Sequence, residues 1–325
     1  MPHLGLAFAL LLGPFAALPA APAAYAGLNE GLAAQQNGDL LTALKEFLPL
    51  AKAGNTLAQT KLAEIYFNGG QSVERNIPQG MEWLRKAVAG GNVDAIYFYA
   101  QVLINGSLEQ AKNVPEAVRL LELIATKAKD QRAMATLAPI YLQGAGVPKD
   151  EKRAVALFTM LGQLGNGGAW RVLAAMADDG QAGLPSDPAT VTAYLAKGAA
   201  LGDAPSHLSL GQRYLQGLGV AKDEKEGGRL ILLAAEGGDF TAMMTLANCY
   251  LGGLCGLSTD NEAALKWLSI VLNRAPQGDA YFQASLVAQD LRNRMSAAAA
   301  ARAQEEAGRW QPKVLGSTQA PAKKP

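Results

Sequence analysis

The sequence contains few of the side chains on which most catalytic and metal sites depend. Its 325 residues include two histidines and two cysteines, and His207 is the only histidine beyond residue 3. Past that point a two-histidine metal site cannot be built, and a Ser-His-Asp or Cys-His arrangement would depend on His207 alone. We therefore predict a protein that is not an enzyme and that carries no metal and no cofactor.

An excess of charge of either sign is also absent. The 29 basic and 28 acidic side chains leave a formal net charge of +1, so no basic field favours nucleic acid. After the N-terminal segment, no apolar run is long enough to span a bilayer. The sequence therefore predicts neither nucleic-acid binding nor a stable membrane span.

The N-terminal segment has the pattern of a secretory signal peptide. Residues 1–26 contain no Lys, Arg, Asp or Glu, residues 4–12 form an apolar run, and residues 24–26 read Ala-Tyr-Ala, a small-x-small cleavage pattern. We predict cleavage before Gly27 and export to the periplasm, with full secretion as the alternative. A membrane anchor is less favoured, because the apolar run is short and prolines interrupt the sequence after it.

Small residues, glycines and capping residues recur in a frame of 36 to 38 residues. The frame opens with a small residue at Ala58, Ala95, Ala133, Ala169, Ser206 and Ala242. The position eight residues later holds Tyr66, Leu103, Tyr141, Ala177, Tyr214 and Tyr250. A glycine follows at Gly69, Gly106, Gly144, Gly180, Gly217 and Gly253. A candidate helix cap comes next at Asn76, Asn113, Asp150, Asp187, Asp223 and Asp260. Seven residues beyond each cap stands a large apolar side chain at Trp83, Leu120, Leu157, Tyr194, Leu230 and Trp267.

This frame predicts a helix hairpin. Apolar side chains spaced i, i+4, i+5 and i+8 form one stripe of a first helix, and the glycine ends that helix because it adopts positive φ without steric cost. The Asn or Asp then caps a second helix. One hairpin is too small to bury its own core, so the copies must stack. We predict an all-α fold, an α/α superhelix (solenoid) of six hairpins over residues 56–275.

Capping elements are expected at both ends of the solenoid. Residues 27–55 predict an N-terminal capping hairpin in which Asp39 caps the second helix. Residues 276–310 predict two C-terminal capping helices, the last beginning after Ser296 and ending at Trp310. Residues 311–325 contain three prolines and small or polar residues, which predicts a disordered tail.

The fifth unit carries the most complete version of the motif. It reads L-G-x-x-Y-x-x-G-x-G-V-x-x-D from Leu210 to Asp223, and this pattern resembles Sel1-like repeats, the hairpin relatives of tetratricopeptide repeats. The third unit also matches well, the first and sixth match fairly, and the second and fourth lack the tyrosine. The resemblance implies an exported bacterial protein that acts as a non-enzymatic interaction scaffold or regulator in the cell envelope. Its partner would be a protein or peptide.

The resemblance also supplies an alternative function. Some cysteine-rich Sel1-like proteins bind or hydrolyse β-lactams, so a cell-wall hydrolase acting on β-lactams or peptidoglycan is the competing hypothesis. The chain lacks the regular cysteine pairs of that group. His207 occupies the second position of the repeat frame, where other units carry Gln59, Ile96, Met134, Trp170 and Met243. This variable, partly covered position favours a packing or surface histidine over a catalytic one.

Cys249 and Cys255 are the only cysteines. An even count in an exported protein favours a disulfide bond over two free thiols. A cysteine nucleophile or a metal-binding pair is a third and weaker interpretation, because no other ligand type is grouped nearby.

Polar side chains form a stripe beside the buried one on the first helices, at positions three, six and ten after the opening residue. Such amides can hydrogen-bond an extended peptide backbone along a concave face, because each has a donor and an acceptor. Alternatively, they satisfy free carbonyl groups at the helix ends. The candidate partner-binding residues are Glu64, Asn68, Gln101, Asn105, Gln143, Asp179, Gln212 and Gln216.

Overall fold

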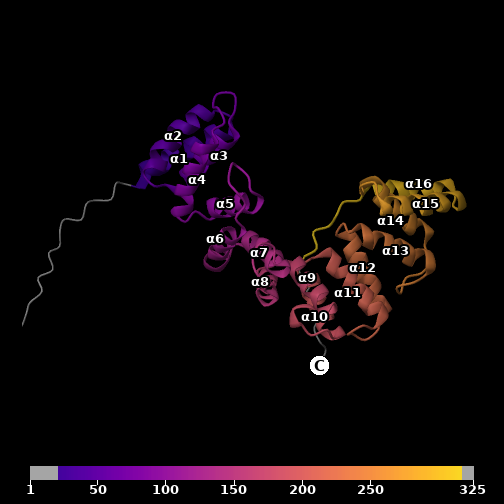
Figure 1. Cartoon of the computed structure of the whole chain (residues 1–325). Helices are drawn as coiled ribbons and strands as arrows, with labels where there is room; N and C mark the ends of the chain where they lie inside the picture. The colour runs from indigo at the N-terminus through magenta and orange to yellow at the C-terminus, as the bar shows by residue number, and fades with distance from the viewer. Residues whose placement is uncertain (1–20, 317–325) are drawn as a thin grey trace, which may run out of the picture. The chain divides into compact units, whose positions relative to one another are not determined.

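The computed structural model describes residues 21–316, and all regular secondary structure in this range is helical. The predicted all-α fold is confirmed. The chain divides between Leu120 and Leu121 into two compact units, which are described one at a time (Figure 1).

The first unit contains an N-terminal hairpin, the first repeat hairpin and most of the second. Its helices are α1 (Ala21–Gln36), α2 (Leu40–Lys52), α3 (Thr56–Asn68), α4 (Ile77–Ala89), α5 (Val93–Asn105) and the start of α6 (Val114–Lys127). Phe47, Leu62 and Leu84 lie in its core. Helix α1 includes the cleavage site predicted before Gly27, and the rest of the predicted signal peptide lies outside the described residues.

The second unit continues the hairpins and ends in two further helices. Its elements are the rest of α6, α7 (Gln131–Gln143), α8 (Glu151–Gln163), α9 (Gly167–Asp178), η1 (Gln181–Gly183), α10 (Pro188–Ala200), α11 (Ala204–Gln216), α12 (Glu224–Glu236), α13 (Phe240–Gly252), α14 (Asn261–Arg274), α15 (Asp279–Arg294) and α16 (Ala297–Arg309). Ile231, Leu246 and Leu265 lie in a core that extends to α15 and α16. Helices α15 and α16 correspond to the predicted C-terminal helices, and the Ser296 hydroxyl accepts a hydrogen bond from Ala299 N at 3.2 Å.

The same positions of each second helix supply the core. In α4, α6, α8, α10, α12 and α14, the fourth, seventh, eighth and eleventh residues after the cap are buried, with only Tyr194 half-buried. Positions 4, 7, 8 and 11 share one face of an α-helix, so one apolar stripe per helix is placed against its neighbours. The sequence frame therefore specifies which side of each helix faces the core.

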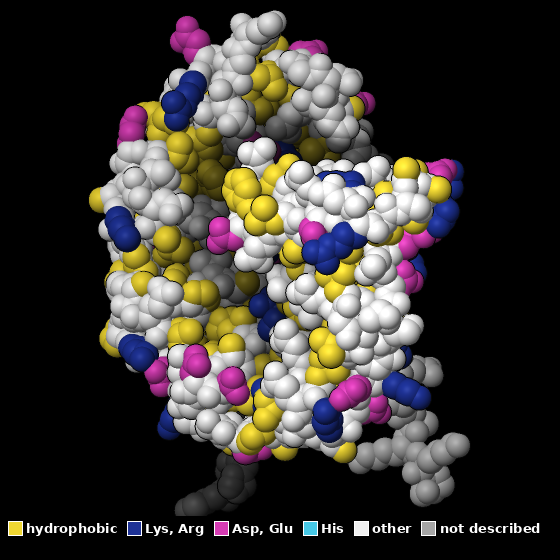
Figure 2. Space-filling view, turned by 90° about the vertical axis from the view of Figure 1, so that its right-hand side faces the viewer, with side chains coloured by type: hydrophobic (Ala, Val, Ile, Leu, Met, Phe, Trp, Pro, Cys, Tyr) yellow, Lys and Arg dark blue, Asp and Glu magenta, His cyan; other side chains and the backbone are white. Residues whose placement is uncertain are grey.

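Charged side chains of both signs are mixed on the surface. On the face shown in Figure 2, Lys and Arg side chains lie among Asp and Glu side chains, and apolar side chains occur between them. Many of the charges are paired, such as Arg302 with Glu262 at 2.7 Å in the second unit. Within the described residues, no helix is long and apolar enough to cross a membrane.

The predicted caps of the second helices are confirmed in all six hairpins. In each case the Asn or Asp side-chain oxygen accepts a hydrogen bond from a backbone N–H two or three residues later, at 2.9–3.2 Å. The predicted Asp39 cap of α2 is also confirmed, with Thr42 N at 3.1 Å from Oδ1. These bonds satisfy N–H groups that have no partner within the helix.

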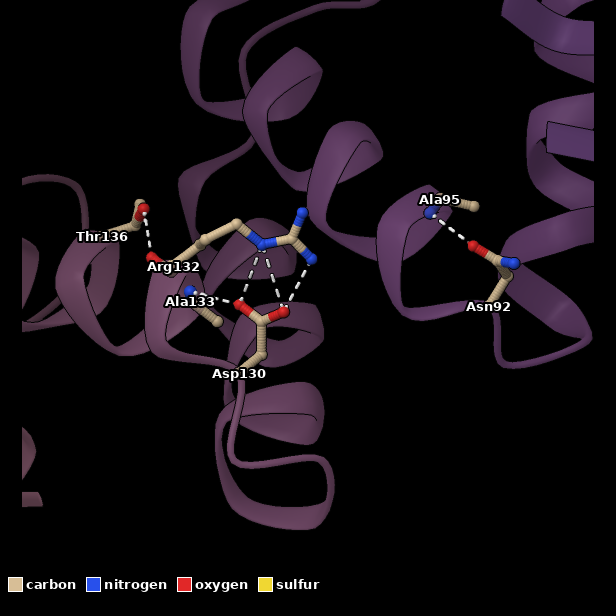
Figure 3. A network of polar contacts seen from close by, with 6 residues as sticks. All are labelled: Asn92, Ala95, Asp130, Arg132, Ala133 and Thr136. Atoms are coloured by element: carbon tan, nitrogen blue, oxygen red, sulfur yellow. Dashed lines mark hydrogen bonds and ion pairs between the residues drawn. The ribbon is translucent and has the colours of Figure 1, made fainter. Parts of the chain in front are cut away.

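A second series of caps begins the first helices, and the sequence analysis did not identify it. Figure 3 shows two members: Asn92 accepts from Ala95 N, and Asp130 accepts from Ala133 N, both at 2.9 Å. Asp130 also pairs with Arg132 at 2.7 Å. The full series is Asn55, Asn92, Asp130, Asn166, Asp203 and Asp239. The sequence does contain a signal for this series, because each member stands three residues before the small residue that opens its hairpin.

The hairpin turns share one backbone hydrogen bond. In the first hairpin, Asn76 N donates to Tyr66 O at 2.8 Å, and the equivalent bond recurs in the second, third, fifth and sixth hairpins at 2.8–2.9 Å. The glycine that ends each first helix has φ between 62° and 72° in all six hairpins. The fourth hairpin differs, because the short helix η1 lies in its turn. Backbone conformation at the glycine and the cap together fixes the reversal of the chain.

The end of the chain departs from the sequence prediction. Disorder was predicted from residue 311, but residues 311–316 are extended and contact the second unit, with Lys313 N donating to Glu236 O at 2.8 Å. This part of the prediction is wrong because it was based on composition alone, and the stabilising contacts come from residues distant in the sequence. Residues 317–325 of the predicted tail lie outside the described residues.

Candidate functional site

In the first unit, the predicted stripe lies beside a hollow of about 340 Å³ between α3 and α5. Asn68 of α3 and Gln101 and Asn105 of α5 line it. Counted from the opening small residue of each hairpin, Asn68 stands at position ten of α3, and Gln101 and Asn105 stand at positions six and ten of α5. The solenoid frame therefore places amides from successive first helices around one space.

Aromatic side chains form the apolar part of this hollow. Phe98 is 43% exposed, and its ring centroid lies 5.7 Å from that of Phe67. The Arg75 guanidinium is held at the rim by a 3.0 Å hydrogen bond from Nε to Phe67 O. Glu64 lines an adjoining hollow of about 230 Å³ with Phe98 and is ion-paired with Lys61 at 2.8 Å. An exposed aromatic ring next to amides suits a peptide, which offers both apolar side chains and backbone polar groups.

In the second unit, a hollow of about 370 Å³ lies between α9 and α11. Gln212 and Gln216 line it together with Ser209, which stands at the third position of the same stripe. All three stripe positions of α11 thus face one space. Arg171 and Arg213 add two guanidinium groups to the lining of this hollow.

Arg213 is held in place by neighbours from other elements. Its Nε donates to Thr192 Oγ1 at 2.7 Å, and its Nη2 donates to Pro188 O at 3.1 Å. Its Nη1 lies 3.7 Å from Asp178 Oδ1, and Arg171 Nε donates to Asp203 Oδ2 at 3.0 Å. A guanidinium held by several partners loses little freedom when it also contacts a ligand. Sequence analysis did not identify Arg213, because its bonds come from α10 and the turn after α11.

Two of the predicted residues do not line these hollows. Gln143 is exposed near the end of α7, and Asp179 is exposed at the C-cap of α9, where Gln181 Nε2 donates to its Oδ2 at 3.2 Å. Asp178, one residue earlier, lines the hollow of the second unit instead. Adjacent residues on a helix point about 100° apart, so a shift of one position changes the face.

The alternative role of the stripe, satisfying helix-end carbonyls, is weakened by the glycines. Gly106 N donates to Val102 O at 2.9 Å at the end of α5, and Gly217 N bonds Arg213 O at the end of α11. These backbone groups already occupy carbonyls of the last turn. The neighbouring amides Asn105 and Gln216 are exposed.

His207 is a packing residue. Its side chain is fully buried, Nδ1 lies 3.1 Å from Asp203 O, and Nε2 has no hydrogen-bond partner. Burial lowers the pKa of His207, and Arg229 lowers it further. His207 is thus fully buried, whereas the sequence predicted partial burial. A buried imidazole of this kind cannot reach a substrate, so a triad based on His207 is not formed.

The two cysteines form a disulfide bond that joins α13 to the turn that follows it. Cys249 and Cys255 are bonded, with their Cα atoms 5.7 Å apart, and neither thiol is free. The expected bridge is present, and the nucleophile and metal-pair interpretations do not apply. Among the described residues, no group of three or more His, Cys, Asp and Glu side chains is placed to hold a metal ion.

These features define a class of protein, a solenoid of α/α hairpins whose first helices present polar faces. The model of the Sel1 repeat matches residues 56–92, 93–128, 131–166, 204–239 and 241–270. The matches cover more than half of the chain, so the protein belongs to the Sel1 repeat family, and Sel1-repeat proteins are generally protein-interaction scaffolds. The fourth hairpin, which carries Ala177 in place of the tyrosine and contains η1, is not matched.

The fold is similar to that of a solved Sel1 repeat protein. A Sel1 repeat protein from Oxalobacter formigenes is 23% identical, with a TM-score of 0.57, over 78% of this chain and 98% of its own. A protective antigen of uropathogenic Escherichia coli strains, c5321, is 20% identical with a TM-score of 0.44, over 93% of this chain and 73% of its own. The first of these likenesses supports the fold. No curated protein matches the sequence.

Proposed function

We propose that this protein is an exported, non-enzymatic scaffold that binds a protein partner through an extended peptide segment on its first-helix faces. The observation that carries the proposal is the lining of the two hollows. In each unit, side chains at the same stripe positions of a first helix surround an open space, Gln101 and Asn105 in one and Gln212 and Gln216 in the other.

The two hollows differ in the peptide groups that they suit. The hollow of the first unit offers Phe98 for an apolar side chain and amides for backbone N–H and C=O groups. The hollow of the second unit offers Arg171 and Arg213, which are suited to carboxylate or carbonyl oxygens. Neither space contains a histidine, and the Sel1 family match gives the hydrolase alternative no support.

The test is affinity capture from a crosslinked cell-envelope extract. Immobilised native protein is compared with a variant in which Gln101, Asn105, Gln212 and Gln216 are changed to alanine. The matched control changes four exposed amides outside the hollows to alanine, namely Gln163, Asn273, Gln289 and Gln304. We expect one protein to be recovered by the native bait and the control and to be lost with the first variant.

Recovery of the same partner by all three baits would refute a role for the amide stripe. Circular dichroism of the baits checks that loss of capture does not come from unfolding. The proposal of export rests on the composition of residues 1–26, and the mass of the endogenous protein checks it.

A further inference from the structure

The chain after α16 turns back and crosses the ends of two earlier hairpins of the second unit. In Figure 1 it is the yellow segment without helical structure that leaves α16. Lys313 N donates to Glu236 O at the end of α12, and Leu315 packs on the turns before α11 and α13. The segment contains residues 310–316, and we call it the C-terminal strap. It is, in effect, an extended peptide bound to the surface of the solenoid.

Polar recognition of the strap is centred on Glu236. Its carbonyl is among the last four of α12, which have no partner within the helix, and the backbone N–H of Lys313 satisfies it at 2.8 Å. The Lys313 ammonium lies 2.6 Å from Glu236 Oε1. A cation at a helix C-terminus is also favoured by the partial negative charge there. One lysine of the strap therefore makes both a backbone and a side-chain contact with the same residue.

Apolar recognition is centred on Leu315, two residues later. Leu315 is half-buried, whereas its neighbour Val314 is 99% exposed, so Leu315 is the apolar side chain of the strap that packs on the surface. A Cβ on Gly237 would lie 2.6 Å from Leu315 Cδ1, and a Cβ on Gly202 would lie 2.2 Å from Leu315 O. Gly237 has a φ of −73°, so its backbone would accept other residues. A side chain at Gly237 would instead fill the space that Leu315 occupies.

The strap is anchored just before these contacts. The Trp310 ring packs edge-on against Trp267 with centroids 6.3 Å apart, and Arg274 Nη2 donates to Trp310 O at 2.7 Å. Trp310 stands only three residues before Lys313, so the strap is held beside its site. A short tether of this kind gives an effective concentration on the order of millimolar, which excludes free peptides of ordinary affinity.

We propose that the edge formed by the α10–α11 and α12–α13 turns is a second peptide-binding site, and that the C-terminal strap covers it in cis. The site takes an extended segment of a partner protein with lysine two residues before leucine. The strap regulates access, because a partner binds only when the strap is displaced. This proposal rests on the contacts of the strap and is independent of the amide stripe.

The test uses the full chain and a fluorescent peptide with the sequence of residues 308–316. Binding is measured by fluorescence anisotropy to the native protein and to a strap variant carrying Lys313→Ser and Leu315→Ser. We expect the peptide to bind the strap variant at least tenfold more tightly than the native chain. A peptide with the same two substitutions should show no binding to either protein.

A third protein tests the location of the site. Adding Glu236→Lys to the strap variant should weaken binding of the native peptide at least tenfold, and a peptide with glutamate in place of Lys313 should recover part of the loss. Changing Gln212 and Gln216 to alanine should leave peptide binding unchanged, which separates this site from the amide stripe.

Three results of the peptide-binding measurements would overturn the proposal. They are absence of peptide binding to the strap variant, equal affinity for the native chain and the strap variant, and indifference to Glu236→Lys. A concentration-dependent dimer of the native chain that the strap substitutions abolish would also overturn it, because the strap would then pass between two copies. Circular dichroism of each variant verifies that the helices remain intact.

Discussion

His207 makes the stability of this protein depend on pH in a range where few other groups titrate. Its imidazole is fully buried, Nε2 has no partner, and burial followed by the nearby Arg229 lowers its pKa from the ordinary value of 6.5. Asp203 acts in the opposite direction, through its backbone carbonyl and its charge. The folded state therefore favours the neutral imidazole, and the unfolded chain takes up a proton first as the pH falls.

The sign and the upper limit of the effect follow from linkage. Since the folded pKa lies below the unfolded one, the stabilisation is complete above the unfolded value and is lost as the pH falls from about 6.5 toward the folded pKa. If His207 stayed neutral in the folded protein over this range, protonation of His207 in the unfolded chain would lower the free energy of unfolding by about 1.4 kcal/mol between pH 7.5 and pH 5.5. The part of the loss that belongs to His207 should not exceed this limit.

The matched variant comes from the repeats themselves. Met134 and Met243 occupy the equivalent position of the third and sixth hairpins, and both are fully buried. A methionine should therefore fit at this position. The substitution His207→Met should remove the part of the difference in unfolding free energy between pH 7.5 and pH 5.5 that His207 causes. The assay is urea denaturation followed by circular dichroism at pH 7.5 and 5.5 for both proteins. Equal pH dependence in the native protein and His207→Met would refute the reasoning.

Two further predictions concern the fifth hairpin and the disulfide bond. A Cβ on Gly211 would lie 2.8 Å from Gly227 O and 3.0 Å from an Ile231 side-chain carbon. Gly211→Ala should lower the free energy of unfolding by about 1–2 kcal/mol, since overpacking of 1–3 kcal/mol exceeds the helix-propensity gain of alanine, and an unchanged denaturation midpoint would contradict this. The endogenous protein should have the mass of a chain starting at Gly27 with Cys249 and Cys255 oxidised. A mass that includes residues 1–26, or two free thiols, would argue against export.

The hairpins could be predicted because the signals that specify them are local. A cap such as Asp150 bonds the backbone N–H only three residues later, and Gly144 acts through its own φ. The caps of the first helices were missed although Asp203 and its equivalents stand in a constant place. They lie three residues before the small residues that define the frame, and so outside the frame itself.

The candidate site was only partly accessible to the same reasoning. Helical spacing correctly put Gln212 and Gln216 on one face. It selected Asp179, whereas Asp178 lines the hollow, because the end of α9 does not follow the frame of the other repeats. Arg213 could not be identified from the sequence as a site residue, since its partners Thr192 and Pro188 stand 21 and 25 residues away.

The sequence by itself determined the repeating hairpin, its period, its caps and the face that each helix buries. Those features depend on interactions within a few residues, which recur with every copy. Only the tertiary structure decided the lining of the hollows, the complete burial of His207 and the position of the C-terminal strap. The contact between Lys313 and Glu236 joins residues 77 apart. Whether such residues meet depends on how many hairpins stack between them and at what angle, which no local pattern specifies.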